Sequence, residues 1–274
     1  MLTRKANDWS DKVGAVWAEQ WRRTDRAFGS LSQKLNTAIA DAAPQGGFRA
    51  FDIGCGAGAT SFALAEARPE AEIIGVDLSP DLLSVAAQRS RHPAIRFVEG
   101  DAGEVACRET PIDLFVSRHG VMFFSDPVAT FARFADVSVP DAAMVFSCFA
   151  EIAANPWVEI ATDGVAPPPF GSPGPFAFAD PDYVGDMLAQ AGWRGEVERC
   201  DFDYIVGEGD KPVEDAMAFL TRIGPAAAML RDADGAQHMA LLTRMRDILS
   251  RNAELGRIAF PASAWIWRAR REAA

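Results

Sequence analysis

A glycine-rich turn preceded by an acid is the part of this sequence best suited to chemistry. Residues 51–58 read Phe-Asp-Ile-Gly-Cys-Gly-Ala-Gly, and an alanine-rich stretch typical of a helix follows. Glycines permit a tight turn and let the backbone approach a ligand. Free N–H groups at the start of the following helix give that end a partial positive charge. Many α/β loops need glycine, so the turn indicates a nucleotide-like ligand only together with other residues.

Two further acids follow predicted strands. Asp77 ends the apolar stretch 72–77, 25 residues after Asp52, and Asp101 follows the stretch 95–99. A carboxylate in the first position can accept the ribose hydroxyls of an adenosine, and one in the second can accept from an adenine amino group. The alternative is that each acid only ends a strand or caps a helix. Open α/β sheets bind ligands at the carboxyl ends of their strands, which favours an adenosine ligand here.

The spacing of the glycines separates two kinds of cofactor. Gly54, Gly56 and Gly58 place the third glycine one residue earlier than the G-x-G-x-x-G pattern of dinucleotide-binding proteins. Asp52 would repel a pyrophosphate but would attract an ammonium group. Neither tyrosine is followed by a lysine four residues later, as some nicotinamide enzymes require. S-adenosylmethionine is therefore the predicted cofactor, and a nicotinamide-dependent oxidoreductase is the less favoured alternative.

Three segments resemble the successive motifs of class I S-adenosylmethionine-dependent methyltransferases. They are residues 51–58, residues 75–79 (Gly-Val-Asp-Leu-Ser) and residues 98–102 (Val-Glu-Gly-Asp-Ala). The likeness covers about residues 45–150 and is greatest to the small-molecule group that includes the ubiquinone and menaquinone biosynthesis enzymes. It implies a seven-stranded sheet whose last strand is antiparallel. A catalytically silent S-adenosylmethionine-binding protein would carry the same motifs and is the second alternative.

The resemblance also assigns cofactor contacts to individual residues. The methionine part would contact the glycine turn, the ribose Asp77, and the adenine Leu78, Asp101 and the Ala102 backbone. Ser117, at the end of the fourth predicted strand, would complete the site. The full set of expected cofactor residues is Asp52, Gly54, Cys55, Gly56, Gly58, Asp77, Leu78, Asp101, Ala102 and Ser117.

The methyl acceptor is expected over the end of the fourth strand, where residues 116–124 read Val-Ser-Arg-His-Gly-Val-Met-Phe-Phe. This stretch lacks the Asn-Pro-Pro-Tyr type motif of enzymes that methylate adenine or glutamine amides. His119 is the only histidine predicted here, and it acts as a general base or packs beside the ligands. Arg118 holds an acidic substrate or forms a structural ion pair. No carboxylate occurs between 117 and 124, so no metal is expected.

Aromatic side chains flank the predicted sheet on both sides in the sequence. Every fourth position of a predicted N-terminal helix is apolar, at Trp9, Val13, Trp17 and Trp21, and a proline-rich loop at 166–181 carries three phenylalanines. Such a cover would exclude water and suit an aromatic or hydrophobic acceptor. The alternative is ordinary core packing. The expected acceptor contacts are Trp17, Trp21, Arg118, Met122, Phe170, Phe176 and Phe178.

The order of predicted elements positions these residues. Strands and helices alternate from residue 48 to 150, which predicts an α/β fold with a doubly wound, mostly parallel sheet. The predicted strands are 49–53, 72–77, 95–99, 112–117, 142–149, 196–206 and 257–268, and the predicted helices are 9–28, 29–43, 59–67, 81–91, 128–137, 181–191, 212–230 and 235–253. We expect one domain, 1–274, with an N-terminal helical cap (1–47), a cofactor-binding core (48–150) and a lid segment with added helices and closing strands (151–274).

The composition limits the remaining possibilities. A net charge of −11 argues against a nucleic-acid partner, which needs a basic surface. The four cysteines are widely spaced and indicate neither zinc nor disulfides. No apolar run approaches the ~20 residues of a membrane span, and the N-terminus lacks the apolar core of a signal peptide. We therefore expect a cytoplasmic monomer or homodimer that acts on a small molecule.

Overall fold

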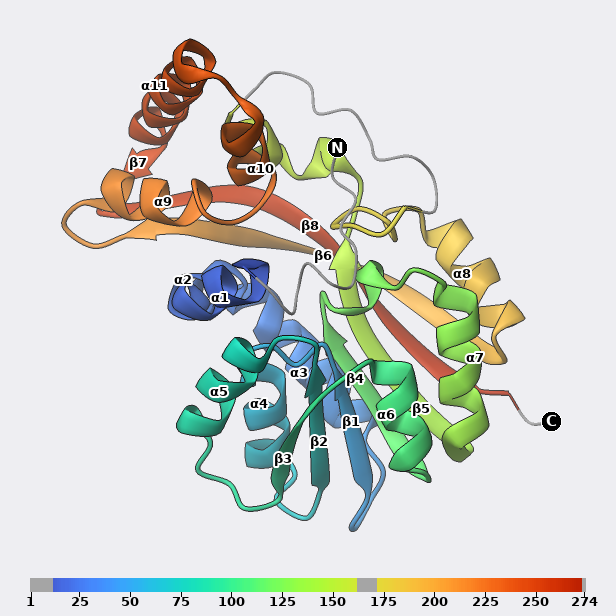
Figure 1. Ribbon diagram of the computed structural model, residues 1–274. Coiled ribbons are helices and arrows are strands. Elements are labelled where there is room, and N and C mark those ends of the chain that lie inside the picture. Colours follow the sequence, from blue (N-terminus) through green and yellow to red (C-terminus); the bar gives the residue numbers. More distant parts are fainter. Residues whose placement is uncertain (1–11, 162–171, 273–274) are drawn as a thin grey trace.

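The computed structural model describes residues 12–161 and 172–272, which form a sheet flanked by helices (Figure 1). The strands follow the order β3-β2-β1-β4-β5-β8-β6, and a short β7 also pairs with β8. Strands β1 to β5 are parallel, whereas β8 is antiparallel to both β5 and β6. This confirms the predicted fold and adds β7. The bounds are β1 (Arg49–Ile53), β2 (Glu72–Asp77), β3 (Ile95–Glu99), β4 (Ile112–Arg118), β5 (Ser138–Phe149), β6 (Trp193–Glu208), β7 (Ala253–Glu254) and β8 (Arg257–Arg271).

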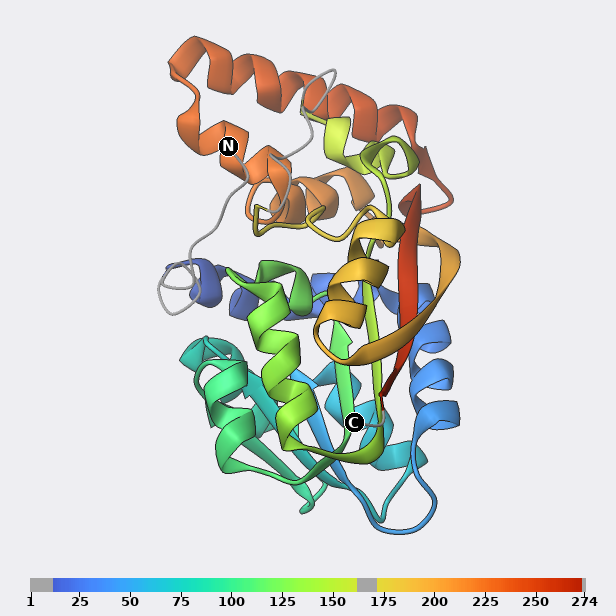
Figure 2. The same cartoon turned by 90° about the vertical axis from the view of Figure 1, so that its right-hand side faces the viewer.

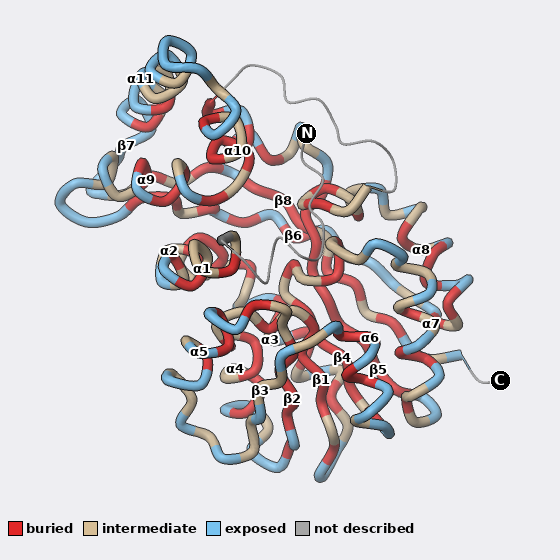
Figure 3. Tube along the Cα trace, in the orientation of Figure 1, coloured by how far each residue is buried: buried red, intermediate tan, exposed pale blue. Residues whose placement is uncertain are grey.

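Helices cover both faces of the parallel strands. On one face lie α3 (Gly29–Ala42), α4 (Ala59–Ala67) and α5 (Pro80–Arg89), and on the other α6 (Ala102–Arg108), α7 (Pro127–Val137) and α8 (Pro181–Gln190). The strands are apolar because both of their faces are buried. Phe51 of β1 and Phe115 of β4 have no exposed surface, and Figure 3 shows these strands as the buried centre of the molecule.

Strands β6 and β8 extend beyond the rest of the sheet. Residues 264–270 of β8 pair with β5, but residues 257–263 pair only with β6 and β7. This outer half is a ribbon that continues past the carboxyl end of β5. The connection between β6 and β8 carries α9 (Pro212–Leu220), α10 (Pro225–Asp232) and α11 (Gly235–Arg251), which we call the cap. Figure 2 shows the cap beyond the carboxyl ends of the parallel strands.

Two short helices lie between the ribbon and the carboxyl end of the sheet. They are α1 (Lys12–Glu19), which contacts α5, and α2 (Trp21–Ala27), which contacts β6. Two arginines of α2 hold one cap carboxylate: Arg23 lies 2.7 Å and Arg26 2.6 Å from Asp215 of α9. Helix α2 is thus attached to the cap by two ion pairs.

The structure corrects three sequence predictions. The predicted helix 9–28 is two helices in its described part, separated at Gln20. The predicted helix 212–230 is also two, because Gly224 has a left-handed φ of 87° and Pro225 begins a new helix. Helix α6 was not predicted, since its seven residues are too few to show a clear period. Among the residues that the structure describes, no helix is long and apolar enough to cross a membrane.

Candidate active site

The glycine turn connects β1 to α4 in a backbone conformation that requires glycine. Gly58 caps α4 with a φ of 87°, and a Cβ atom there would lie 2.6 Å from the Phe62 ring. Gly54 has a φ of 61°, and a Cβ atom there would lie 3.0 Å from the Cα of Gly120. Cys55 is buried within the turn, and its N–H donates to the Val76 carbonyl at 2.9 Å. The turn is therefore packed tightly between β2 and the segment after β4.

Asp52 is fully buried at the base of this turn. Its Oδ2 accepts a hydrogen bond from the Ser61 hydroxyl at 2.6 Å, while its Oδ1 is buried without a partner in the described part of the chain. Burial raises the pKa of Asp52 to about 7, although the Ser61 hydrogen bond and the charge of Arg118 oppose that rise. A buried carboxylate oxygen without a donor costs free energy. A cationic ligand group would remove that cost, as the ammonium of S-adenosylmethionine would.

Asp77 ends β2 beside the same turn. Its two oxygens accept from the backbone N–H groups of Gly56 and Ser79, each at 2.9 Å. Each carboxylate oxygen has a second lone pair, so both remain able to accept a ribose hydroxyl. Burial raises the pKa of Asp77, and these backbone hydrogen bonds oppose the rise. Leu78 is half-buried next to it.

Asp101 caps a helix and still presents an exposed carboxylate. Its Oδ1 accepts from the Glu104 N–H at 3.1 Å and caps α6, so the capping alternative is correct. The residue is exposed nevertheless, and Ala102 is the first residue of α6. The Gly100 N–H donates to the Asp77 carbonyl at 3.0 Å, which places this loop beside the end of β2. The predicted ribose and adenine residues are thus neighbours.

Ser117 has a structural role at the end of β4. Its hydroxyl donates to the Ile53 carbonyl at 2.7 Å and accepts from the Gly120 N–H at 3.1 Å. The hydroxyl therefore ties β4 to the start of the glycine turn. The hydroxyl uses its only hydrogen within the protein, so a cofactor could contact Ser117 only through the remaining lone pair or through the backbone.

His119 directly follows β4 and is held rigidly. It has a left-handed φ of 60°, its N–H donates to the Ser147 carbonyl at 3.1 Å, and its Nδ1 lies 2.8 Å from the Ser147 hydroxyl. Its Nε2 is buried and has no partner within the described residues. Burial, aided by the charge of Arg118, lowers the pKa of His119 to about 3. The imidazole is therefore neutral and, unlike a histidine with an ordinary pKa, does not begin to take up a proton near pH 6.5.

Around His119 lies a group of buried rings, which we call the ring cluster. The imidazole centroid is 4.3 Å from that of Phe149 and 4.8 Å from that of Phe28. Tyr204 lies 5.4 Å from Phe28 and stacks on Trp157 at 4.7 Å. The members come from six separate segments of the chain: Phe28, His119, Phe149, Trp157, Phe176, Phe202 and Tyr204.

Asp25 joins the cofactor turn to the acceptor end of the site. Its Oδ1 accepts from Arg118 at 2.8 Å, and its Oδ2 accepts from Arg89 at 2.9 Å. Arg118 also donates to the Ser32 hydroxyl, and Arg89 donates to the Ala57 carbonyl within the glycine turn at 2.7 Å. The ion-pair alternative for Arg118 is thus correct, and its guanidinium is already engaged.

Three of the predicted acceptor contacts lie on α1, on α2 and in the turn after β4. Trp21 of α2 lies beneath two guanidinium groups, at 3.8 Å from Arg89 and 4.4 Å from Arg22, and Trp17 is half-buried on α1. Met122 is buried, and its carbonyl accepts from the Gly174 N–H at 3.0 Å.

The phenylalanines of the proline-rich loop lie in different surroundings. Phe176 belongs to the ring cluster, at 5.5 Å from Phe149. Phe178 instead packs against Phe131 and Phe146, at centroid distances of 6.3 and 6.5 Å. This is the core between β5 and α7, so the core-packing alternative is correct for Phe178. Phe170 lies outside the described residues, as does the first predicted tryptophan, Trp9.

Sequence reasoning missed most of the ring cluster and Asp25. Phe28, Phe149, Trp157, Phe202 and Tyr204 show no common spacing, because tertiary packing alone brings them together. Phe202 and Tyr204 share one face of a strand, which their separation by two residues could have indicated. That face becomes part of the site only because the ribbon extends beyond the sheet.

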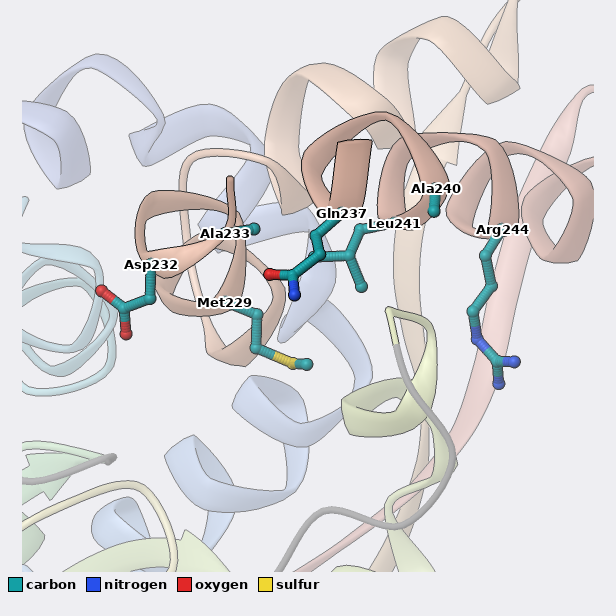
Figure 4. Close-up of a pocket in the computed structure, with 7 residues that line it drawn as sticks. All are labelled: Met229, Asp232, Ala233, Gln237, Ala240, Leu241 and Arg244. Carbon is teal, nitrogen blue, oxygen red and sulfur yellow. The ribbon is translucent and has the colours of Figure 1, made fainter. Parts of the chain in front are cut away.

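Two further observations concern places where ligands could bind. An open pocket of about 490 Å³ lies between α10 and α11, and Met229, Leu241 and Arg244 are among its lining residues (Figure 4). It contains none of the predicted site residues. Within residues 12–161 and 172–272, no three His, Cys, Asp or Glu side chains gather closely enough to hold a metal ion. Metal independence stays a prediction.

Comparisons with known proteins agree with this geometry. Residues 50–141 match a family model described as a methyltransferase domain. The malonyl-[acyl-carrier protein] O-methyltransferase of Halalkalibacterium halodurans is 34% identical over 103 residues, which cover 36% of this chain and 38% of that protein. The demethylmenaquinone methyltransferase of Deinococcus radiodurans is 30% identical over 110 residues, which cover 39% and 46%. The chain therefore matches less than half the length of either relative.

The fold as a whole also resembles a solved structure. The YcgJ protein of Bacillus subtilis superimposes with a TM-score of 0.58 at 16% identity, over 88% of this chain and 99% of that one. The matched family segment contains the glycine turn, Asp77, Asp101 and the His119 turn. Residues 50–141 therefore form a methyltransferase domain with the motifs of the class I S-adenosylmethionine-dependent methyltransferases, and the cofactor that this domain takes is S-adenosylmethionine.

Proposed function

We propose that the protein transfers a methyl group from S-adenosylmethionine to a small, uncharged, aromatic or hydrophobic molecule without a metal ion. The observation that carries this is the contact between two turns. A Cβ atom on Gly54 of the glycine turn would lie 3.0 Å from the Cα of Gly120, the residue after His119. A donor held by the first turn and an acceptor against the ring cluster would therefore be neighbours, as in-line displacement requires.

The residues of the glycine turn and the strand ends would hold the donor. S-adenosylmethionine supplies a methyl group that its sulfonium makes electrophilic. Asp52 would bind the ammonium through its unpartnered Oδ1, and Asp77 would accept the ribose hydroxyls. Asp101 and the Ala102 backbone would contact the adenine, with Leu78 beside the ring.

The acceptor side supports an uncharged molecule. The ring cluster presents apolar surface, and burial raises the pKa of Tyr204, which stays neutral. Arg118, whose guanidinium lies 5.6 Å from the Phe28 ring centroid, already pairs with Asp25 and donates to Ser32. An acidic acceptor could pair with Arg118 only by displacing Asp25 from it. A cationic acceptor would be repelled by Arg118 and would find no carboxylate in the ring cluster to pair with. Exclusion of water by the rings would favour the displacement.

The test is turnover with a panel of acceptors of matched size. We expect S-adenosylhomocysteine to form with uncharged aromatic acceptors such as 2-naphthol, and not with 2-naphthoate or a naphthylmethyl ammonium. Mass spectrometry of the acceptor would show the added methyl group. EDTA should leave the rate unchanged; loss of activity that Mg²⁺ restores would contradict the metal-free part. Binding of S-adenosylmethionine without turnover of any acceptor would instead indicate a catalytically silent binding protein.

A further inference from the structure

The Nε2 atom of His119 is buried without a hydrogen-bond partner among the described residues, which is unfavourable for the folded protein. The residue is only 8% exposed, its Nε2 has no partner in the described part of the chain, and its φ of 60° is unusual outside glycine. An unpaired buried polar atom destabilises the folded protein, and an unfavourable backbone conformation adds to that. Such costs are found where the surrounding structure holds a group for a ligand.

Ser147 fixes how the imidazole is oriented. Its carbonyl accepts the His119 N–H, and its hydroxyl lies 2.8 Å from Nδ1. When Nδ1–H donates to this hydroxyl, Nε2 carries a free lone pair and can only accept a hydrogen bond. When the hydroxyl donates to Nδ1, Nε2–H is a donor instead, so the proposal below requires the first tautomer. The imidazole remains neutral, because burial opposes its protonation and Arg118 adds to this effect.

The ring cluster decides what can reach this atom. Phe28 and Phe149 pack against the imidazole, and Tyr204 and Trp157 continue the same apolar surface. The cluster contains no carboxylate that could neutralise a cation. A flat, uncharged ring can pack against such a surface, and one hydrogen-bond donor on that ring would satisfy Nε2.

We propose that the acceptor is a neutral aromatic molecule with a hydroxyl or amino group, and that this group donates a hydrogen bond to Nε2 of His119. The proposal rests on the proposed function and narrows its acceptor class. His119 and its Ser147 partner then determine specificity. They distinguish a protic aromatic from an aromatic hydrocarbon, an ether, a carboxylate or a cation of the same size.

The experiment measures binding in the absence of turnover. The full chain is saturated with S-adenosylhomocysteine and titrated with 2-naphthol, 2-methoxynaphthalene, naphthalene, 2-naphthoate and a naphthylmethyl ammonium. We expect 2-naphthol to bind about tenfold more tightly than naphthalene or the ether, since one net hydrogen bond distinguishes them. The two charged probes should bind more weakly still.

Two variants keep the test independent of folding defects. The double variant His119→Phe, Ser147→Ala keeps an aromatic ring at position 119. It removes the imidazole nitrogens and the Ser147 hydroxyl together, so neither side chain leaves a buried polar atom unpaired. This double variant should lose the preference for 2-naphthol while binding S-adenosylhomocysteine normally. Phe178→Leu changes a ring that packs on Phe131 and Phe146 instead, so the preference should survive there.

The outcomes are distinguishable. Equal binding of 2-naphthol and naphthalene, tightest binding of the ether or of a charged probe, or no saturable binding of 2-naphthol would each overturn the proposal. Survival of the preference in the double variant would do the same. If 2-naphthol binds with the expected preference but is not methylated when S-adenosylmethionine replaces the product, this recognition stands and the proposed function fails.

Discussion

The two halves of the site are built in different ways. The residues expected to hold the cofactor, apart from Ser117, lie between Asp52 and Ala102, in three consecutive strand ends of one parallel sheet. The ring cluster spans Phe28 to Tyr204 and draws on the residue between α2 and α3, the turn after β4, the end of β5, the segment after it and the β6 ribbon. The first half is polar and carries its unpaired atom on Asp52, whereas the second is apolar and carries its unpaired atom on His119.

This difference separates what is common to a fold from what is particular to one protein. Parallel strands deliver their carboxyl ends to one edge, so a cofactor site there needs only a few residues at fixed spacing. The family match, residues 50–141, covers that half. Most of the ring cluster lies outside the match, at Phe28 between α2 and α3, in the segment after residue 148 and in the ribbon. Acceptor specificity can therefore change without any change to the cofactor half.

The largest effect should come from the charge of the cofactor half. Asp52→Asn should weaken S-adenosylmethionine binding by about 2–5 kcal/mol, because the ligand's ammonium would lose its buried counter-charge. In the wild type the affinity should fall about tenfold per pH unit below pH 7, since Asp52 with a pKa of about 7 must first ionise. It should fall again above about pH 8, where the ligand's amino group loses its proton.

Calorimetry from pH 5 to 9 would check this, and the acid-side slope should vanish in Asp52→Asn. The ligand-free protein offers a second readout. Because folding raises the pKa of Asp52 from 3.8 to about 7, its contribution to stability is lost as the pH rises through that window. Asp52→Asn should therefore raise the Tm of the ligand-free protein at pH 8. A lower Tm there, with an unchanged pH slope, would contradict the role of Asp52.

On the acceptor half, His119→Ala should lower kcat while leaving cofactor affinity intact. If His119 takes the acceptor proton, the loss should lie near the lower end of the ~10²–10⁴ range for general bases, since its pKa of about 3 makes it a weak one. At saturating cofactor, the wild-type rate should show no limb near pH 6.5 from this residue. His238→Ala, a change in the cap, is the control. A loss confined to KM would show that His119 only packs or binds.

The same contrast explains which parts of the site could be predicted from sequence. Asp77 and Asp101 directly follow apolar stretches, and strand ends of a parallel sheet converge, so their proximity followed from local patterns alone. Tyr204 could not be placed, because its position depends on how far β6 extends past β5. Arg118 was adjacent to the predicted site, but its partner Asp25 lies 93 residues earlier, at no spacing that a sequence pattern reveals.

Asp77→Ala should have an intermediate effect on the cofactor half. We expect S-adenosylmethionine affinity to fall by about 1–3 kcal/mol, since the ribose hydroxyls would lose a charged acceptor. Part of that loss would come from the turn itself, because the N–H groups of Gly56 and Ser79 also bond to this carboxylate. Binding of S-adenosylhomocysteine and of adenosine should weaken in parallel. Unchanged adenosine binding would contradict the ribose role.

The smallest effect should come from the link between the two halves. In Asp25→Asn, Arg89 and Arg118 lose the carboxylate that they share. Helix α2, which carries Asp25, is then no longer held over the glycine turn by these ion pairs. These side chains are about one-fifth exposed, so we expect a loss of only about 1 kcal/mol in S-adenosylmethionine affinity.

Asp215→Asn is the matched control. It also removes a carboxylate that holds two arginines of α2, but on the side of the cap. If α2 only needs to be held in place, the two variants should weaken cofactor binding equally. If Asp25 acts by holding Arg89 against the Ala57 carbonyl, only Asp25→Asn should weaken cofactor binding. Calorimetry on both variants decides, and an equal loss would show that the two halves communicate through the position of the helix rather than through this ion-pair bridge.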